Sequence, residues 1–174
     1  MKKLTPIDHQ ILFQLIKNSR QSDRQIAKTL KISQPTVTRR RTILEKNGLL
    51  EYTSIPDLKK LEFEILAFIF GKWNFQKYPD TRVDDMHKFI DSHPNIIFIS
   101  TGTGQNYDRI GISFHRNYSD YSKTIQDFQE GWGKYFENFS SFIVSLESDN
   151  ILRNLTFKHL AEYMNQPDQN KTTR

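Results

Sequence analysis

The sequence predicts an α+β protein with two parts, an N-terminal winged helix-turn-helix and a C-terminal ferredoxin-like βαββαβ half. Three observations lead to this fold class. Residues 6–47 hold three apolar helical patterns separated by capping and helix-breaking residues. Residues 63–146 alternate apolar, strand-like runs with amphipathic helical stretches. Basic residues are concentrated in the first part, which indicates that the two parts have different roles.

The net charge changes sign between the two parts. Residues 1–60 hold 13 Lys and Arg against 5 Asp and Glu, a net charge of +8, whereas residues 61–174 hold 12 against 15, a net charge of −3. A basic segment joined to a mildly acidic one is typical of a nucleic-acid-binding module attached to a second domain. The chain has no cysteine, which excludes disulfides, thiol nucleophiles and cysteine-based zinc sites.

The first helix is expected to begin at Pro6, with Thr5 as its N-cap and Asp8 near the positive end of the helix dipole. The apolar pattern ends near residue 18. Its core-facing residues are Ile7, Ile11, Leu12, Leu15 and Ile16.

The next two helices form a helix-turn-helix pattern. Ser22 caps the second helix, with Gln25 at the capping-box position, and an apolar face follows. Lys31 and Ile32 form the turn, and Ser33 caps the third helix. The residues of the apolar face are Ile26, Ala27 and Leu30.

The third helix carries the run Arg39-Arg40-Arg41. Pro35 lies in its first turn, where a missing N–H costs nothing. Val37 and Leu44 are seven residues apart and are expected to face the core, and Gly48 ends the helix with positive φ.

The outward face of the third helix suggests DNA binding. With Val37 and Leu44 inward, Gln34, Thr38, Arg39 and Thr42 project outward, and Arg40 and Arg41 flank the buried edge. A helix fits the major groove, where Arg pairs with guanine and Gln with adenine. The alternative is a basic, solvated face on an ordinary helical hairpin. The DNA-binding candidates are Ser22, Arg24, Lys28, Ser33, Gln34, Thr36, Thr38, Arg39, Arg40, Arg41 and Lys46.

This region resembles the recognition helix of the Lrp/AsnC (leucine-responsive, "feast/famine") regulators. The residues that carry the pattern S-x-x-T-V-x-x-R-x-x-x-L-E-x-x-G are Ser33, Thr36, Val37, Arg40, Leu44, Glu45 and Gly48. Leu4, Thr5, Asp8, Ile11 and Leu12 resemble the family's first helix. The resemblance implies a sequence-specific transcriptional regulator that binds double-stranded DNA as a dimer or higher homo-oligomer. The family usually has an aliphatic residue in place of Arg41, so either Arg41 reaches out of the core edge or the helix is rotated.

Phosphate and base contacts are assigned separately. Arginine and lysine bind phosphates without regard to sequence, whereas side chains that reach base edges supply the sequence preference. Two operator half-sites one helical turn apart are contacted by two helix-turn-helix domains, so we expect a homodimer, in which each subunit supplies one such domain. The expected phosphate contacts are Arg24, Lys28, Arg39, Arg40 and Lys46. The expected base contacts are Gln34, Thr38 and Arg39.

The remaining elements complete two domains. A strand over residues 49–54 would begin the wing, so the DNA-binding domain is residues 1–55, and residues 56–62 are the linker. Residues 63–164 form the second domain. Its order of strands and helices resembles that of the regulation-of-amino-acid-metabolism (RAM) domain of the same family. Its expected elements are a strand over 63–73, a helix over 83–92, a strand over 95–100, a turn over 101–108, a strand over 109–115, a helix from 117 or 119 to about 136, and a strand over 139–146.

The last residues are less well determined by the pattern. Residues 151–164 form either a helix or a continued strand, with Leu152 and Leu155 buried. The polar segment 165–174 is predicted to be disordered.

The turn that follows the second strand is a candidate effector site. Gly102-Thr103-Gly104 does not fit a dinucleotide fingerprint, because Tyr107 replaces the third glycine and a strand follows. In the family that this chain resembles, small effectors such as amino acids bind near this loop; the alternative is a plain hairpin turn. The effector candidates are Thr101, Gly102, Thr103, Gly104, Tyr107 and Asp108.

No metal or cofactor site is expected. His87 and Asp91 with Asp84 lack a second histidine at ligand spacing and indicate an exposed helix face. The large aromatics Trp73, Tyr78 and Trp132 are expected in the core or at a subunit interface.

Two other classes of protein fit the same sequence. Siroheme decarboxylases resemble the same two-domain architecture, so an enzyme that handles a tetrapyrrole with histidines and basic residues is the first. A partner-binding module that has lost its ligand is the second. The longest apolar run, residues 65–70, is far shorter than the ~20 residues that span a bilayer, and no apolar region follows the first lysines. We therefore expect a cytoplasmic protein and no membrane partner.

Overall fold

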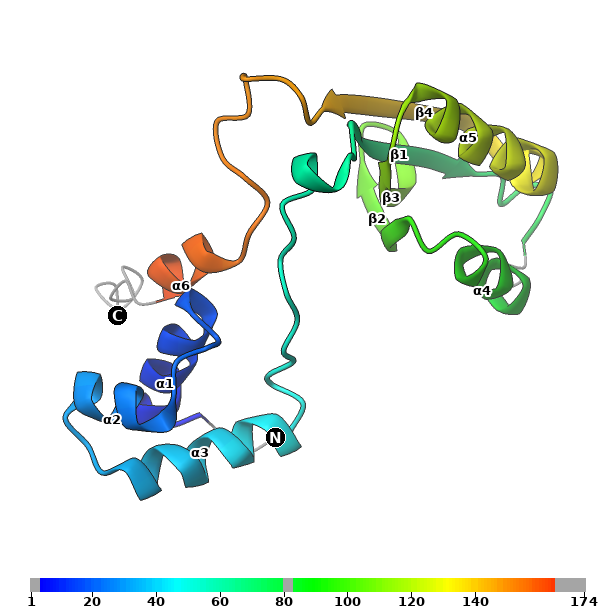
Figure 1. The fold of residues 1–174 in the computed structure, drawn as a ribbon. Helices are drawn as coiled ribbons and strands as arrows, with labels where there is room; N and C mark the ends of the chain where they lie inside the picture. Colours follow the sequence, from blue (N-terminus) through cyan, green and yellow to red (C-terminus); the bar gives the residue numbers. More distant parts are fainter. Residues whose placement is uncertain (1–3, 80–82, 165–174) are drawn as a thin grey trace, which may run out of the picture. The chain divides into compact units, whose positions relative to one another are not determined.

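The computed structural model describes residues 4–79 and 83–164, which fall into two compact units. The first unit contains residues 4–55 and 153–164, and the second contains the described residues between 56 and 152 (Figure 1). The prediction of disorder for 165–174 lies outside the described residues. The division differs from the expected domains, because the structure groups residues 153–164 with the helix-turn-helix unit instead of the sheet.

The first unit is built from three helices, α1 (Pro6–Lys17), α2 (Asp23–Leu30) and α3 (Gln34–Lys46). These bounds confirm the predicted helices. The buried core residues of the three helices are Ile11, Leu12, Leu15, Ile26, Ala27, Val37 and Leu44. Each buried Val, Leu or Ile side chain contributes about 1.5–3 kcal/mol of transfer free energy, which is the main stabilisation of so small a unit. Val37 and Leu44 face inward as predicted.

The predicted wing strand over 49–54 is wrong: residues 50–57 form no strand. Leu49 and Leu50 instead pack against the helical core. A strand needs a partner with free backbone groups, and no strand exists among the described residues of this unit.

A short C-terminal helix, α6 (Lys158–Met164), packs against α1 in the first unit. Ala161 is fully buried at this contact, and Glu162 lies 3.5 Å from Lys17. The helical alternative for the end of the chain is therefore correct for residues 158–164. The expected burial of Leu152 and Leu155 is wrong, because their side chains are 101% and 64% exposed.

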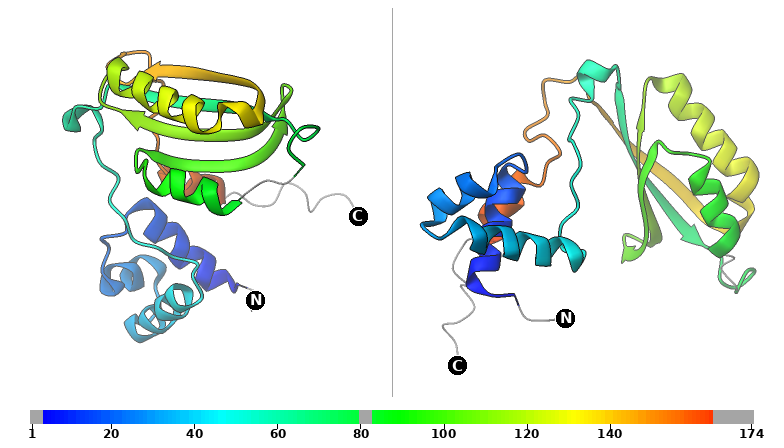
Figure 2. Two further views of the ribbon diagram at one scale, coloured as in Figure 1. Left: turned by 90° about the vertical axis from the view of Figure 1, so that its right-hand side faces the viewer. Right: turned by 60° about the horizontal axis from the view of Figure 1, so that its bottom comes forward.

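The second unit is an antiparallel sheet with two helices, which confirms the ferredoxin-like fold class. The strands are β1 (Ile65–Trp73), β2 (Ile96–Gly104), β3 (Tyr107–His115) and β4 (Phe136–Ser145), in the order β2-β3-β1-β4. The helices α4 (Val83–Asp91) and α5 (Tyr118–Trp132) cover one face of the sheet (Figures 1 and 2). Short 3₁₀ turns, η1 (Lys59–Leu61) and η2 (Gly133–Tyr135), precede β1 and β4.

Two predicted boundaries in this unit are wrong. The turn expected over 101–108 is only Gln105 and Asn106, both with positive φ, because β2 continues to Gly104. The helix expected to reach Phe136 ends at Trp132, and Phe136 already belongs to β4. The large aromatics pack as expected: Trp73 is buried and stacks on Tyr135 at 5.5 Å.

The two faces of the sheet differ. Ile65 and Ala67 of β1 pack against Tyr121 of α5. Because side chains alternate along a strand, Phe68 lies on the other face, which no helix among the described residues of this unit covers. We call the row that crosses all four strands on this face the open-face row. Its members, in spatial order, are Phe98, Ile112, Phe68 and Phe142.

Candidate nucleic-acid interface

The helix-turn-helix is formed by side-chain caps that act on consecutive helices. The side chain of Ser22 accepts from Gln25 N at 3.3 Å, and Gln25 Oε1 accepts from Ser22 N at 2.8 Å. Lys31 adopts the left-handed conformation that turns the chain, with φ of 55°. Ser33 then caps α3 by accepting from Thr36 N at 3.3 Å. The candidates Ser22, Ser33 and Thr36 therefore begin the two helices, which fixes where α3 starts.

Four cationic candidates are exposed and have no hydrogen bond or ion pair within residues 4–79 and 83–164. We call them the free cations, and they are Arg24, Lys28, Arg39 and Lys46. Two lie on α2 and two on α3. Gln34 is also exposed, at the start of α3. Free cations beside an exposed helix face are what a phosphate backbone needs.

Arg40 is held inside the unit. Its Nε donates to Asp8 Oδ1 at 2.7 Å, and its Nη2 contacts Asp8 Oδ2 and donates to Thr5 Oγ1 at 2.5 Å. The Asp8 side chain is almost wholly buried. Burial alone would raise the pKa of Asp8, but hydrogen bonds from Thr5 and the charge and hydrogen bonds of Arg40 lower it below its usual value. Arg40 therefore ties α3 to the start of α1.

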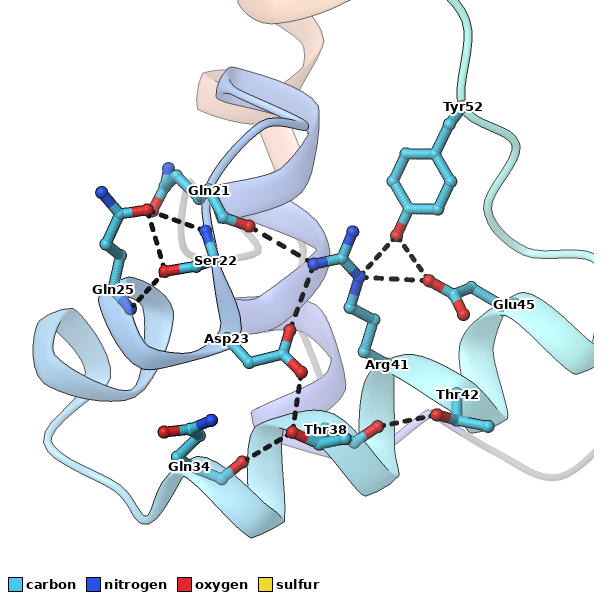
Figure 3. A network of polar contacts seen from close by, with 10 residues as sticks. All are labelled: Gln21, Ser22, Asp23, Gln25, Gln34, Thr38, Arg41, Thr42, Glu45 and Tyr52. Atoms are coloured by element: carbon cyan, nitrogen blue, oxygen red, sulfur yellow. Dashed lines mark hydrogen bonds and ion pairs between the residues drawn. The ribbon is translucent and has the colours of Figure 1, made fainter.

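Arg41 lies at the centre of a second network, which we call the Arg41 cluster (Figure 3). Its Nε donates to Tyr52 Oη at 2.8 Å and to Glu45 Oε1 at 3.1 Å. Its Nη1 donates to Asp23 Oδ1 at 3.1 Å and to Gln21 O at 3.3 Å. Burial by itself lowers the pKa of Arg41, yet the hydrogen bonds of the cluster raise the pKa above its usual value. Because this guanidinium has partners on α2 and after α3, it fixes the two helices together.

The Arg41 cluster explains the departure from the family pattern at this position. Val37 and Leu44 are both buried, so α3 has not rotated away from its core. Arg41 instead leaves the core edge and satisfies its donors on neighbouring side chains.

The structure also shows residues that the sequence analysis did not single out. Asp23 accepts from Arg41 with one oxygen and, with the other, from Thr38 Oγ1 at 2.7 Å. Tyr52 donates to Glu45 Oε1 at 2.8 Å. Within the Arg41 cluster, only the Arg41–Glu45 ion pair could have been predicted from the sequence, from its i,i+4 spacing. The others join segments with no fixed spacing in the sequence.

The effector candidates lie on the two strands of the β2–β3 hairpin. The exposed stretch from Thr101 to Gly104 belongs to the edge strand β2. Asp108 Oδ1 accepts from Trp73 N at 3.1 Å, and its buried Oδ2 lies 3.4 Å from Lys72 Nζ. Tyr107 Oη accepts from Asn138 at 3.3 Å. Tyr107 Oη and Asp108 Oδ1 thus have hydrogen-bond partners within the sheet, whereas Asp108 Oδ2 has an ion pair with Lys72 and no hydrogen bond.

Comparisons with known proteins agree with this geometry. The family described as winged helix-turn-helix DNA-binding matches residues 4–51. The HTH-type transcriptional regulator LysM of Sulfurisphaera tokodaii is 34% identical over 69% of this chain and 81% of its own length. An uncharacterised HTH-type regulator of Pyrococcus abyssi is 32% identical over 49% of this chain, which spans 58% of that relative.

Solved structures show the same fold along nearly the whole chain. A regulator from Neisseria meningitidis, solved as a complex with L-Met, superposes with a TM-score of 0.73 at 19% identity, covering 91% of this chain and 99% of its own. E. coli AsnC gives 0.68 at 18% identity, covering 88% and 98%.

The chain belongs to the Lrp/AsnC family of DNA-binding transcriptional regulators. It is a regulator and not an enzyme, and the relatives give no support to the tetrapyrrole alternative. None of the helices in the described ranges is long and apolar enough to span a membrane.

Proposed function

We propose that α3 reads DNA in the major groove and that the free cations bind the flanking phosphates, in a cytoplasmic homodimer. One observation carries this assignment. The capped α2–turn–α3 pair presents an exposed helix face on which Arg39 and Lys46 have no partner among the described residues. Gln34, Thr38 and Arg39 are the proposed base-contacting residues. Arg40 and Arg41 position the helix and do not bind phosphate, because Asp8 and the Arg41 cluster hold their charges.

The salt dependence of binding separates these two groups of arginines. Affinity falls as salt rises, and each cation that neutralises a phosphate adds about 0.9 to the steepness of log affinity against log salt. Removal of one such cation makes the dependence shallower by that amount. Fluorescence anisotropy is measured at several salt concentrations on a duplex selected from a random library by the full-length protein. Arg39→Ala and Lys46→Ala are each expected to lower the slope by that amount, whereas Arg40→Ala leaves it unchanged. Lys123→Ala, an exposed cation on α5, is the control. Identical slopes for all variants would overturn the assignment.

The homodimer is proposed to form through the open-face row. Phe98 and Phe142 at the two edges of the sheet are 48% and 64% exposed, so an apolar stripe crosses the whole face. A second copy is the occupant that fits, because the face is self-complementary in chemistry and two half-sites require two reading heads.

Sedimentation equilibrium tests the dimer. Phe142→Glu places a charge in the stripe and is expected to yield monomers. The control is Tyr118→Glu, which alters an aromatic side chain of equal 64% exposure on α5, outside the open face. A Phe142→Glu protein that remains dimeric would place the interface elsewhere.

A small effector is proposed to bind at the end of the β2–β3 hairpin. The hydroxyls of Thr101 and Thr103 are exposed on an edge strand, where backbone groups are also free to bind a zwitterion. The Neisseria regulator of the same fold was solved with L-Met. Thermal shift with the individual amino acids is expected to identify a stabilising ligand, because binding to the folded state raises its stability. Thr103→Val should abolish the shift and Thr53→Val should keep it; no shift with any amino acid would contradict the proposal.

A further inference from the structure

The hydroxyl of Thr38, on the outward face of α3, has a fixed direction. Its Oγ1 lies 2.7 Å from Asp23 Oδ2 and 3.2 Å from Gln34 O (Figure 3). Both neighbours are acceptors, a carboxylate and a carbonyl. A threonine hydroxyl has one hydrogen and two lone pairs. The hydrogen is therefore used within the protein, and the remaining lone-pair capacity is left for a ligand.

Asp23 is itself held in position. Its second oxygen, Oδ1, accepts from Arg41 Nη1 at 3.1 Å, and both side chains of this ion pair are about four-fifths buried. Asp23 is also the first residue of α2, where the helix dipole favours a negative charge. Arg41 compensates the charge of Asp23, so the carboxylate can lie beside a DNA-binding face without strongly repelling phosphates. The acceptor that orients Thr38 is thus a fixed part of the unit.

We propose that Thr38 is a specificity-determining residue that acts as a hydrogen-bond acceptor, with Asp23 and Arg41 as its positioning residues. In the major groove, adenine and cytosine present an amine donor, whereas guanine and thymine present acceptors. An oxygen that cannot donate distinguishes these two classes. Thr38 therefore selects an amino base, adenine or cytosine, over a keto base at one position of the contacted strand in each half-site. This inference rests on the proposed role of α3 in reading DNA.

A purely structural role for the Thr38–Asp23 bond would have a different consequence. If the bond only joined α2 to α3, its loss would change the unfolding free energy and lower affinity for all sequences equally. A reading role changes base preference at a single position. The experiment therefore measures sequence preference and not affinity alone.

The test is selection of bound duplexes from a randomised library, followed by sequencing, with full-length wild-type protein and matched variants. Wild type is expected to enrich amino bases at one position by roughly 3- to 10-fold, the range of one net hydrogen bond. Thr38→Val, which keeps the shape and removes the oxygen, should lose the preference at that position only. Thr38→Ser, which keeps the hydroxyl, should retain it. Thr29→Val is the control, because Thr29 Oγ1 also donates to a carbonyl, Gln25 O, but lies on α2.

Two further measurements separate the roles of Thr38 and Asp23. Asp23→Asn offers an amide donor to Thr38 Oγ1, which leaves the hydroxyl hydrogen of Thr38 available to donate to a keto base. The enrichment of amino over keto bases at that position should therefore decrease. In the selected duplex, the preferred adenine is replaced by purine, or the preferred cytosine by 2-pyrimidinone, to remove the amine. Wild type should then lose the same 3- to 10-fold in affinity, whereas Thr38→Val should lose nothing further.

The outcomes distinguish this inference from the proposed function. If wild type binds no DNA at low salt, both are overturned. If wild type selects a motif that Thr38→Val leaves unchanged, or if the position affected prefers guanine or thymine, the acceptor role of Thr38 is overturned and the DNA-reading role of α3 remains. An unchanged ratio in Asp23→Asn, with a changed one in Thr38→Val, removes Asp23 as the positioning residue.

Discussion

Three consecutive arginines of α3 have three different environments. Each residue turns about 100° around a helix, so adjacent side chains face different neighbours. Arg39 faces outward, Arg40 reaches Asp8, and Arg41 reaches Asp23. The sequence shows a basic run but not which charges are already paired, because Asp8 is 32 positions from Arg40. The outward and inward sets of α3 could be predicted from periodicity; the pairing of the flanking arginines could not.

Replacement of Arg40 and Arg39 should separate stability from binding. Arg40→Ala leaves the buried carboxylate of Asp8 without its cation, which should lower the unfolding free energy by about 1–3 kcal/mol. Arg39→Ala removes an exposed side chain and should change it by less than about 0.5 kcal/mol. Urea unfolding followed by circular dichroism measures both. If Arg40→Ala changed the unfolding free energy as little as Arg39→Ala, the Arg40–Asp8 pair would contribute nothing to stability.

A buried histidine should make the second unit sensitive to acid. His115 is fully buried, with Nε2 2.8 Å from Ser113 Oγ and Nδ1 3.9 Å from Asp120 Oδ2. Burial lowers its pKa, although the charge of Asp120 opposes this. Below about pH 6.5 the unfolded chain binds a proton that the folded state does not, so stability falls as pH drops toward the folded pKa.

The slope of that loss can reach about 1.4 kcal/mol per pH unit. Urea titrations between pH 7.5 and 5 measure it. His115→Gln cannot take up this proton and should show a shallower dependence despite its lower stability at pH 7.5. A dependence as steep as that of wild type would assign the acid sensitivity to another group.

Elements with a strong period were predictable, and elements defined by partners were not. The strands and helices of the sheet unit follow alternation and helical periodicity, and so their existence and order are correct. The strand at 49–54 fails because β-propensity cannot supply a pairing partner. The position of α6 could not be predicted, since a helix with one buried residue, Ala161, gives no indication of which core it joins. The turn predicted over residues 101–108 is too long. Gly102 and Gly104 suggested a loop, although both lie in β2.

The packing of α6 on α1 can be tested with a charge. Ala161→Asp places a carboxylate at a fully buried position, which should release α6 and destabilise the first unit by about 1–3 kcal/mol. Hydrogen exchange of the α1 amides should increase in this variant. Tyr163→Asp, at a 72% exposed position on the same helix, is the control. Unchanged exchange in Ala161→Asp would mean that α6 does not protect α1.

For the molecule as a whole, the proposals above give the two units separate roles. The basic segment, residues 1–60 with a net charge of +8, contains the candidate DNA-binding face. The sheet unit contains the open-face row, and residues 61–174, which include its four strands, have a net charge of −3. This division predicts that loss of dimerisation weakens DNA binding without changing any residue near DNA.

The linkage between dimer and operator can be measured with one variant. In a dimer the two helix-turn-helix domains are linked, so the second half-site is bound intramolecularly. This increases affinity by roughly 10²–10⁴-fold when both half-sites are engaged. Phe142→Glu should lose most of this gain on a duplex with two half-sites and should match wild type on a duplex with a single half-site. Anisotropy titrations on both duplexes provide the comparison, with Tyr118→Glu as control. If Phe142→Glu lost affinity equally on both duplexes, its effect would lie in the folding of the chain, and the open-face row would not be what couples the two reading heads.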